Sequence, residues 1–118
     1  MVTFRFSSAI RGFHVYRYNW TPVVGEKLGS AREYGNPNDK RAVAITKGNI
    51  TVGHVPMEIS KIVWYFLRKG GRMTCTVRGK HIRSRLAQGG LEVPCSMTFR
   101  GEEDLMDKLK VLLSEHTN

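Results

Sequence analysis

Short runs of alternating hydrophobic and polar residues recur along this chain, and a period of two is typical of half-buried β-strands. These runs predict strands at residues 10–18, 42–46, 50–55, 73–79 and 91–99. A tight turn at 47–49 joins the second and third runs into a predicted β-hairpin. The last run is expected to break or bend at Pro94 and to pair with the fourth across the basic loop 80–90. Residues 1–9 show no clear period and form either a loose arm or an edge strand.

Two stretches instead repeat their hydrophobic residues at helical spacing. The first covers residues 57–69, where Pro56 suits the first turn of a helix and the two glycines that follow end it. We interpret its aromatic stripe as core rather than as a ligand site. The second covers residues 102–115 and begins with three acidic residues, which the helix dipole favours at that end. We interpret this helix as a packing helix, with a partner-binding helix as the alternative.

The pattern therefore predicts a mainly β protein with two α-helices. A chain of 118 residues fits one domain, which we place at residues 10–118 behind an N-terminal arm of residues 1–9. Small strand-rich domains of this kind often close into a Greek-key barrel such as the OB-fold. The expected architecture is an OB-fold-like small β-barrel of about six strands.

The charge of the chain adds a partner to this picture. The formal net charge is +9 and the isoelectric point is about 10.0. Between residues 59 and 91 there are eight Lys and Arg residues and no Asp or Glu, whereas the stretch after Gly101 is rich in acids. Charge concentrated in this way predicts a polyanionic partner, most often nucleic acid. A basic protein without such a partner remains the alternative.

Other classes of function find little support in the sequence. The chain has no run of about 18 apolar residues and no apolar leader, so we expect no membrane partner and an intracellular, reducing location. Cys75 and Cys95 fall in strand-like runs and are expected to be buried, and no cysteine or histidine spacing predicts a metal or another cofactor. No GxSxG or GxxxxGK[ST] motif occurs, and Asp39 alone cannot hold a catalytic Mg²⁺. A binding module is therefore expected rather than an enzyme.

The most polar stretch, residues 32–42, lies between two strand-like runs. It has a dense turn signal and is the first candidate site. A rigid loop of this composition can grip a sugar-phosphate end, because its cations neutralise phosphate and its carboxylate accepts a hydroxyl. The candidate residues in it are Asn36, Asn38, Asp39, Lys40 and Arg41. The alternative is a well-made turn without a ligand.

Further candidates lie outside that loop. His54 can donate to a phosphate or serve a structural role at the end of its strand. Three aromatic residues, Tyr18, Trp20 and Tyr34, either stack on bases or are buried. Four cations in and beside the basic loop can neutralise phosphates, namely Arg78, Lys80, Arg83 and Arg85.

Several motifs of the chain resemble those of the HIRAN domain. They are RG at 11–12, WTPVV at 20–24, REYGNPNDKRAVAI at 32–45, VGHVP at 52–56 and MTFRG at 97–101. The resemblance extends from about residue 10 to residue 113. It implies a modified OB-fold that binds the 3′-hydroxyl end of single-stranded DNA, and it adds Phe99 to the candidate residues.

The resemblance also implies roles for individual residues. Asp39 matches the acid that receives the terminal 3′-hydroxyl, and Asn36 matches a polar residue of the same pocket. His54 matches a histidine near the end phosphate, and Phe99 matches an aromatic residue that lines the pocket. The chain departs from the family at Asn38 and Asn19, because the family member that binds 3′ ends has aromatic residues at these two positions.

The function expected from charge and resemblance together is non-catalytic binding of single-stranded DNA at free 3′-hydroxyl ends. DNA repair or the replication fork is the expected context, in the nucleus, with fusion to or association with a larger helicase or nuclease. Two alternatives remain open at this point. One is a general binder of DNA or RNA that acts through charge, and the other is a protein-interaction module that has lost the DNA pocket.

Overall fold

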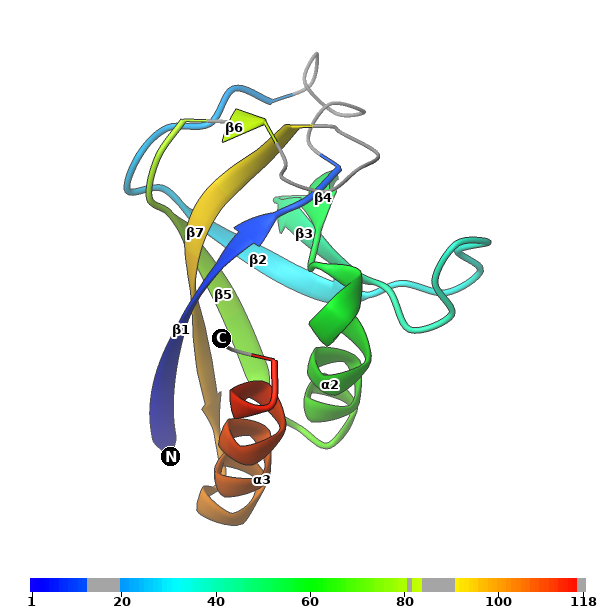
Figure 1. Cartoon of the computed structure of the whole chain (residues 1–118), viewed down its shortest axis with the longest axis vertical. Coiled ribbons are helices and arrows are strands. Elements are labelled where there is room, and N and C mark those ends of the chain that lie inside the picture. Colours follow the sequence, from blue (N-terminus) through cyan, green and yellow to red (C-terminus); the bar gives the residue numbers. More distant parts are fainter. Residues whose placement is uncertain (13–19, 81, 84–90, 117–118) are drawn as a thin grey trace.

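The computed structural model describes residues 1–12, 20–80, 82–83 and 91–116 of the chain (Figure 1). The elements in these ranges are β1 (Val2–Ile10), β2 (Lys27–Arg32), β3 (Val43–Lys47), β4 (Ile50–His54), α2 (Met57–Arg68), β5 (Arg72–Val77), β6 (Ile82–Arg83), β7 (Leu91–Gly101) and α3 (Glu103–Ser114). The predicted mainly β fold with two helices is confirmed. The strand predicted at 10–18 falls for the most part outside the described residues.

The strands form one antiparallel sheet in the order β1-β7-β5-β2-β3-β4, and β6 pairs with β7 beside this path. The sheet is not closed, because β1 and β4 lie at the two ends of the path. An isolated bridge between Arg11 and His54 joins these ends through two backbone hydrogen bonds of 2.8 Å. The predicted OB-fold-like barrel of about six strands is therefore confirmed in an open form, since the path has six strands and only this bridge joins its ends in the described residues.

The N-terminal residues form an edge strand and not a loose arm. β1 pairs with β7 from Val2, opposite Gly101, to Ile10, opposite Val93. Its even-numbered apolar residues face the core while the odd-numbered residues from Thr3 to Ser7 are exposed. β7 continues through Pro94 as one strand, so of the predicted break or bend at that residue the break is excluded. As predicted, β7 also pairs with β5.

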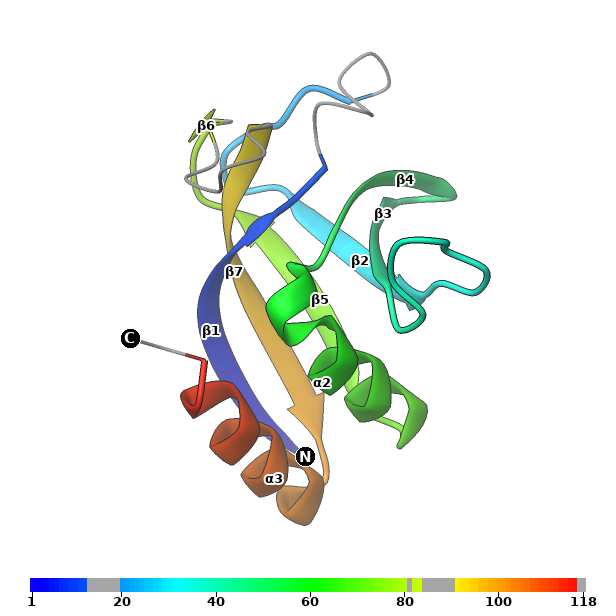
Figure 2. The ribbon, with the colours of Figure 1, turned by 45° about the vertical axis from the view of Figure 1, so that its right-hand side comes forward.

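The β3–β4 hairpin and both helices follow the sequence pattern. The hairpin turns at Gly48, whose φ of +61° lies in the left-handed region that glycine tolerates. α2 begins after Pro56 and is followed by Gly70, with a φ of +99°. α2 and α3 pack against each other on one side of the sheet (Figures 1 and 2). Neither helix in the described ranges is long and apolar enough to cross a membrane.

Close packing in the core explains two further features. A Cβ on Gly53 would lie 2.3 Å from Ile10 Cγ2 and 2.8 Å from the carbonyl oxygen of Arg11, so only glycine lets β4 approach the end of β1. Cys75 and Cys95 are buried with their sulfur atoms 4.0 Å apart, as expected for small apolar core residues. The contact with Cys95 and burial together raise the pKa of the Cys75 thiol well above its ordinary value.

Candidate nucleic-acid interface

The candidate loop projects from the end of the sheet between β2 and β3 (Figure 2). Its base is closed by a hydrogen bond of 2.9 Å from the backbone N–H of Glu33 to the carbonyl oxygen of Ala42. Gly35 gives the chain its turn with a φ of +78°. The predicted turn between two strands is therefore present.

Asn36 organises the interior of this loop. Its Oδ1 accepts hydrogen bonds from the backbone N–H groups of Asn38, at 2.8 Å, and Asp39, at 3.2 Å. Its Nδ2 donates to Oε1 of Glu33 at 2.8 Å. One side chain thus satisfies two backbone donors and holds the acid at the start of the loop, as asparagine does in such turns.

Asp39 fastens the loop to α2. Its Oδ1 accepts a hydrogen bond of 2.9 Å from the backbone N–H of Arg41, and its Oδ2 accepts one of 2.6 Å from Oγ of Ser60. Each carboxylate oxygen has about two acceptor positions, so one remains on each oxygen for a further donor. Asp39 therefore has a structural role and keeps the capacity to accept a ligand hydroxyl.

His54 is connected to the same loop through Glu33. Nε2 of His54 lies 2.9 Å from Oε2 of Glu33, and because an ionised carboxylate only accepts, Nε2 carries the hydrogen. Burial raises the pKa of Glu33, but the hydrogen bonds from His54 and Asn36 lower it by more, so the pKa lies below its ordinary value. The structure thus joins His54, Glu33, Asn36 and Asp39 into one network.

The remaining loop residues divide between solvent and α2. Asn38 and Lys40 are exposed at the tip of the loop. Arg41 turns toward the helix, where its Nε lies 3.4 Å from the hydroxyl of Tyr65. Arg41 also lowers the pKa of that hydroxyl by hydrogen bonding and by its charge. The side chain of Tyr34 is 71% exposed.

Two aromatic candidates are buried, which corrects their predicted roles. Phe99 has no exposed surface and lies between Phe66, at 5.5 Å between ring centroids, and Phe4, at 6.4 Å. It is a core residue and does not line a pocket. Trp20 is 4% exposed and donates its Nε1–H to Glu26 at 2.9 Å, so it offers no free face for stacking. Tyr18 lies outside the described residues.

The basic loop is described only in part. Arg78 and Lys80 are exposed, and Nε of Arg78 donates to Oγ of Ser96 at 2.8 Å. Arg83 lies in the short strand β6, where a loop was predicted. Arg85 lies outside the described residues. The pairing of β6 with β7 corrects the loop prediction for residues 82–83.

Three residues that contact the candidate loop or its network were not among the sequence candidates. Glu33 accepts hydrogen bonds from His54 and Asn36 and so orients both side chains. Ser60 on α2 donates a hydrogen bond to Asp39. Trp64 underlies the arginines of the loop. Ser60 could have been noticed in the sequence, because it is a serine within the apolar stripe of a predicted helix. The contacts of Glu33 and Trp64 depend on the tertiary fold and have no such signal.

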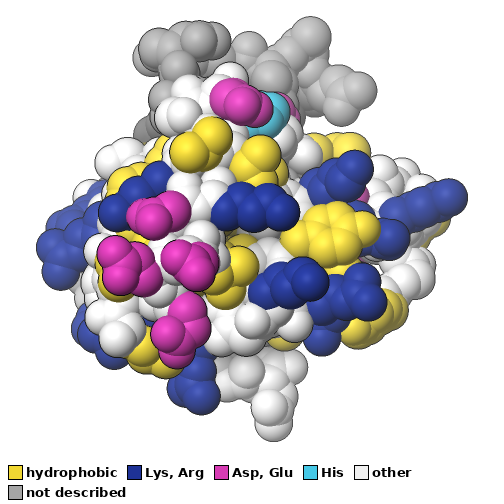
Figure 3. Space-filling model, turned by 90° about the horizontal axis from the view of Figure 1, so that it is seen from below, with side chains coloured by type: hydrophobic (Ala, Val, Ile, Leu, Met, Phe, Trp, Pro, Cys, Tyr) yellow, Lys and Arg dark blue, Asp and Glu magenta, His cyan; other side chains and the backbone are white. Residues whose placement is uncertain are grey.

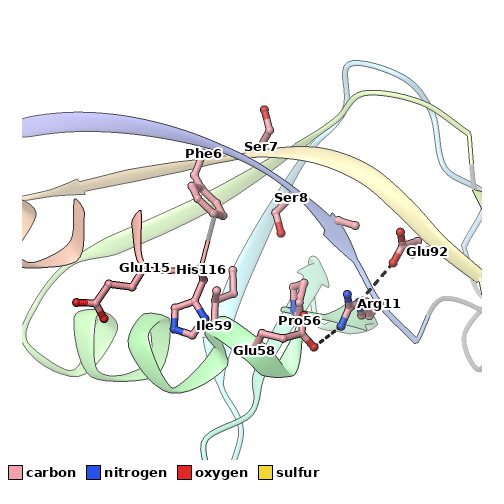
Figure 4. Close-up of a pocket in the computed structure, with 11 residues that line it drawn as sticks. Phe6, Ser7, Ser8, Arg11, Pro56, Glu58, Ile59, Glu92, Glu115 and His116 are labelled. Carbon is pink, nitrogen blue, oxygen red and sulfur yellow. Dashed lines mark hydrogen bonds and ion pairs between the residues drawn. The ribbon is translucent and has the colours of Figure 1, made fainter. Parts of the chain in front are cut away.

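A separate cleft of about 570 Å³ lies between β1 and the ends of the two helices (Figure 4). Arg11 crosses it and pairs with Glu58 at 2.6 Å and Glu92 at 3.3 Å. Glu115 contributes a further acid to its lining. None of the predicted binding residues lines this cleft, and its acids do not suit a phosphate. In the part of the chain that is described, no three His, Cys, Asp or Glu side chains gather to hold a metal ion.

Comparison with solved structures identifies the fold. The crystal structure of the HIRAN domain of human HLTF is similar with a TM-score of 0.73 and 22% identity, over 97% of this chain and 89% of that chain. An NMR structure of the HLTF HIRAN domain in its DNA-bound conformation has a TM-score of 0.68 and 25% identity, over 98% and 90% of the two chains.

A crystal structure of a Lactobacillus plantarum protein is more distant, with a TM-score of 0.53 and 17% identity over 84% of this chain and 98% of that chain. No protein-family model and no curated protein matches the sequence. The fold predicted from the motifs is nevertheless found along nearly the whole chain. The chain has the fold of the HIRAN domain.

Proposed function

We propose that this chain is a non-catalytic module that binds single-stranded DNA at a free 3′-hydroxyl end. The observation that carries the proposal is the likeness to a HIRAN domain in its DNA-bound conformation, which extends over 98% of the chain. The net charge of +9 supports a polyanionic ligand.

The geometry of the loop supports end recognition in particular. The carboxylate of Asp39 is held in place by Arg41 N–H and Ser60 Oγ and retains acceptor positions for a hydroxyl. His54 is held by Glu33 at the end of β4, where its ring can meet the last phosphate. Because these groups are fixed before the ligand arrives, binding requires little ordering of the protein.

The decisive measurement compares two labelled oligonucleotides by fluorescence anisotropy, one ending in a 3′-hydroxyl and one in a 3′-phosphate. A 3′-phosphate lacks the donor and brings a second negative charge to Asp39, so we expect its affinity to be roughly tenfold or more lower. Equal affinities would exclude end recognition.

The role of Asp39 is tested with Asp39→Asn, which keeps an acceptor for the Arg41 N–H and a polar group beside Ser60. This variant should lose most of the preference for the 3′-hydroxyl, because the repelling charge is gone. Ser60→Ala is the matched control, since it removes the other partner of that hydrogen bond and leaves the carboxylate. If Asp39→Asn prefers the 3′-hydroxyl over the 3′-phosphate as strongly as the wild type does, Asp39 only holds the loop in place.

A general charge-driven binder of DNA or RNA is the second candidate function. It is favoured by the exposed cations Lys40, Arg78 and Lys80, which need no defined end. Such a binder would treat both 3′ termini alike and would not distinguish RNA from DNA. Its affinity would fall steeply with salt, with a slope of about −0.7 for each phosphate contacted on a single strand.

The cellular part of the proposal is a nuclear role in DNA repair or at replication forks, in a chain fused to or associated with a larger helicase or nuclease. It rests on the motif resemblance. Imaging of the tagged protein, with and without agents that stall forks, tests it directly. Exclusion of the protein from the nucleus under both conditions would contradict it.

A further inference from the structure

Three arginines surround one tryptophan where the loop meets α2. The guanidinium carbon atoms of Arg41, Arg32 and Arg68 lie 4.8, 4.9 and 5.9 Å from the ring of Trp64. Trp64 is 6% exposed, and its Nε1–H is buried without an acceptor among the described residues. Cations at these distances are attracted by the face of an indole, which holds them beside it.

Two tyrosines extend this cluster. The ring of Tyr65 meets Trp64 edge-on at 5.1 Å, and the ring of Tyr34 does so at 6.1 Å. Arg32 lies 5.7 Å from the Tyr34 ring and Arg41 lies 5.7 Å from the Tyr65 ring. Tyr34 is nevertheless 71% exposed, so a large part of its ring is available to a ligand.

The charges of this cluster are not balanced by acids. Across residues 1–12, 20–80, 82–83 and 91–116, none of the three arginines forms an ion pair with a carboxylate. The nearest acids in the sequence, Glu33 and Asp39, are engaged by His54 and Ser60. Arg32 and Arg41 are half-buried, so both have lost part of their water without gaining a counterion.

The wider surface has the same polarity. Figure 3 shows Lys and Arg side chains around an exposed hydrophobic side chain on the half of this face that belongs to α2 and the loop. Acidic side chains gather on the other half, over α3, which has Glu103, Asp104 and Asp107. Lys61 is exposed on α2 and adds to the positive half.

We propose that this α2–loop surface, formed by Arg32, Tyr34, Arg41, Lys61, Tyr65 and Arg68, is a second contact for single-stranded nucleic acid. The proposal rests on the proposed function and extends it, since the strand would pass from Asp39 in the candidate loop of residues 32–42, here the end-binding loop, onto α2. Tyr34 stacks on a base, and the cations bind the phosphates on either side of that base. The surface lies next to the loop because Asp39 and Arg41 both contact α2.

The combination of groups selects this ligand over other polyanions. A single strand offers unstacked bases and regularly spaced phosphates together, and it therefore matches an exposed aromatic ring set among cations. Duplex DNA keeps its bases stacked inside and would leave Tyr34 without a partner. An acidic peptide would satisfy the arginines and leave the ring unused.

The test compares oligonucleotides of about 4 and about 16 nucleotides, the range of site sizes for one OB fold. We expect Tyr34→Ala to weaken binding of the long oligonucleotide about fivefold or more, because a stacked base is lost. It should weaken binding of the short oligonucleotide much less, because we expect that ligand to reach Asp39 and His54 without extending onto α2. Tyr34→Phe keeps the ring and should bind like the wild type.

Arg68→Ala tests the phosphate contact, and Arg100→Ala, an exposed arginine on β7, is the control with the same change of charge. Arg68→Ala should reduce the salt slope for the long oligonucleotide by about 0.7, and Arg100→Ala should not change it. Both substituted side chains are exposed, so both variants are expected to fold, which circular dichroism verifies.

Wild-type binding of the long oligonucleotide by both Tyr34→Ala and Arg68→Ala would overturn this proposal and leave the 3′-end comparison untouched. Polyglutamate and unlabelled oligonucleotide can be compared as competitors at equal total charge. If polyglutamate displaces the long oligonucleotide as well as the unlabelled oligonucleotide does, the proposal is overturned in favour of an acidic-peptide site. Weakening of the long oligonucleotide by Tyr34→Ala, with equal affinity for both 3′ termini, would support this surface and reject the end-binding loop.

Discussion

Asn36 shows how one side chain shapes the candidate loop. It accepts from two backbone N–H groups and donates to Glu33, so the positions of Asp39 and of His54 both depend on it. The motif resemblance implies that Asn36 belongs to a pocket for the ligand. The hydrogen bonds indicate that it first acts on the protein, by giving the loop one conformation.

Asn36→Ala is expected to destabilise the fold by about 1–2 kcal/mol, because two backbone donors lose their acceptor and Glu33 loses a donor. Thermal unfolding measures the change, and faster hydrogen exchange at the amides of Asn38 and Asp39 would locate it. Asn38→Ala is the control, since that exposed side chain lies in the same loop. Equal melting temperatures for both variants would contradict this role of Asn36.

The lowered pKa of Glu33 has a consequence for stability at low pH. A carboxyl whose pKa is lower in the folded state stabilises the fold fully above its ordinary value of 4.5, and this contribution is lost as the pH falls through the lower folded value. Glu26 behaves in the same way, because burial raises its pKa but hydrogen bonds from Val23 N–H, Lys47 and Trp20 lower it by more.

We therefore expect the unfolding free energy of the wild type to drop more between pH 7 and about pH 3 than that of Glu33→Gln. Urea unfolding at both values measures the two drops. Glu102→Gln, at an exposed position before α3, should follow the wild type. If the unfolding free energy of Glu33→Gln drops as much as that of the wild type, Glu33 does not contribute to the loss of stability at low pH.

At the scale of elements, the approach of β4 to the end of β1 depends on Gly53. Gly53→Ala should destabilise the fold by about 1–3 kcal/mol, because the new Cβ meets the backbone of Arg11 as well as Ile10. Gly79→Ala is the matched control, with its Cβ at an ordinary 3.6 Å from Pro94, and should change stability by less than about 0.5 kcal/mol. Chemical denaturation measures the unfolding free energy of both variants, and equal values would contradict this role of Gly53.

The packing of β7 against α2 gives a test of Phe99. Phe99→Leu should cost about 1 kcal/mol of stability, since its ring lies between Phe66 and Phe4. The affinity of the folded protein for a 3′-hydroxyl oligonucleotide should not change, because the side chain is not exposed. Lower affinity at unchanged stability would return Phe99 to the binding site.

The sequence predicts elements well where the pattern is local. Alternation and helical spacing place the β3–β4 hairpin, α2 and α3 within about two residues of their ends. β6 has two residues, too few to show any period. Phe99 is misplaced because its burial depends on how β7 pairs with β1 and β5, which no local pattern contains.

The same limit applies to the candidate site. The loop and its turn follow from residue types alone, whereas the contact of Asp39 with Ser60 and that of Arg32 with Trp64 join distant parts of the sequence. Trp64 also has a helical position that predicts core, and it is indeed buried. Its role in holding arginines becomes visible only when β2 and the loop are placed beside α2.

At the scale of the whole molecule, the N-terminal strand is a structural part of the sheet. Deletion of residues 1–9 should abolish cooperative unfolding, because β7 would lose its pairing with β1 and the core would lose Val2, Phe4 and Phe6. Thermal unfolding followed by circular dichroism measures this. Thr3→Ala with Arg5→Ala, which changes exposed positions of β1 only, should retain the cooperative transition. A sharp transition in the deletion variant would identify residues 1–9 as a dispensable arm.

The two buried cysteines make the molecule convenient to label. The thiolate is the form that reacts with maleimide dyes. Burial shields both thiols from the dye, and the raised pKa of Cys75 keeps its own thiolate scarce at neutral pH. A cysteine introduced at an exposed position such as Asn49, in the hairpin turn, would then react selectively in the folded protein. A fluorophore can thus be attached at a chosen site while both native cysteines stay in the core, and each binding experiment can follow the protein as well as the oligonucleotide.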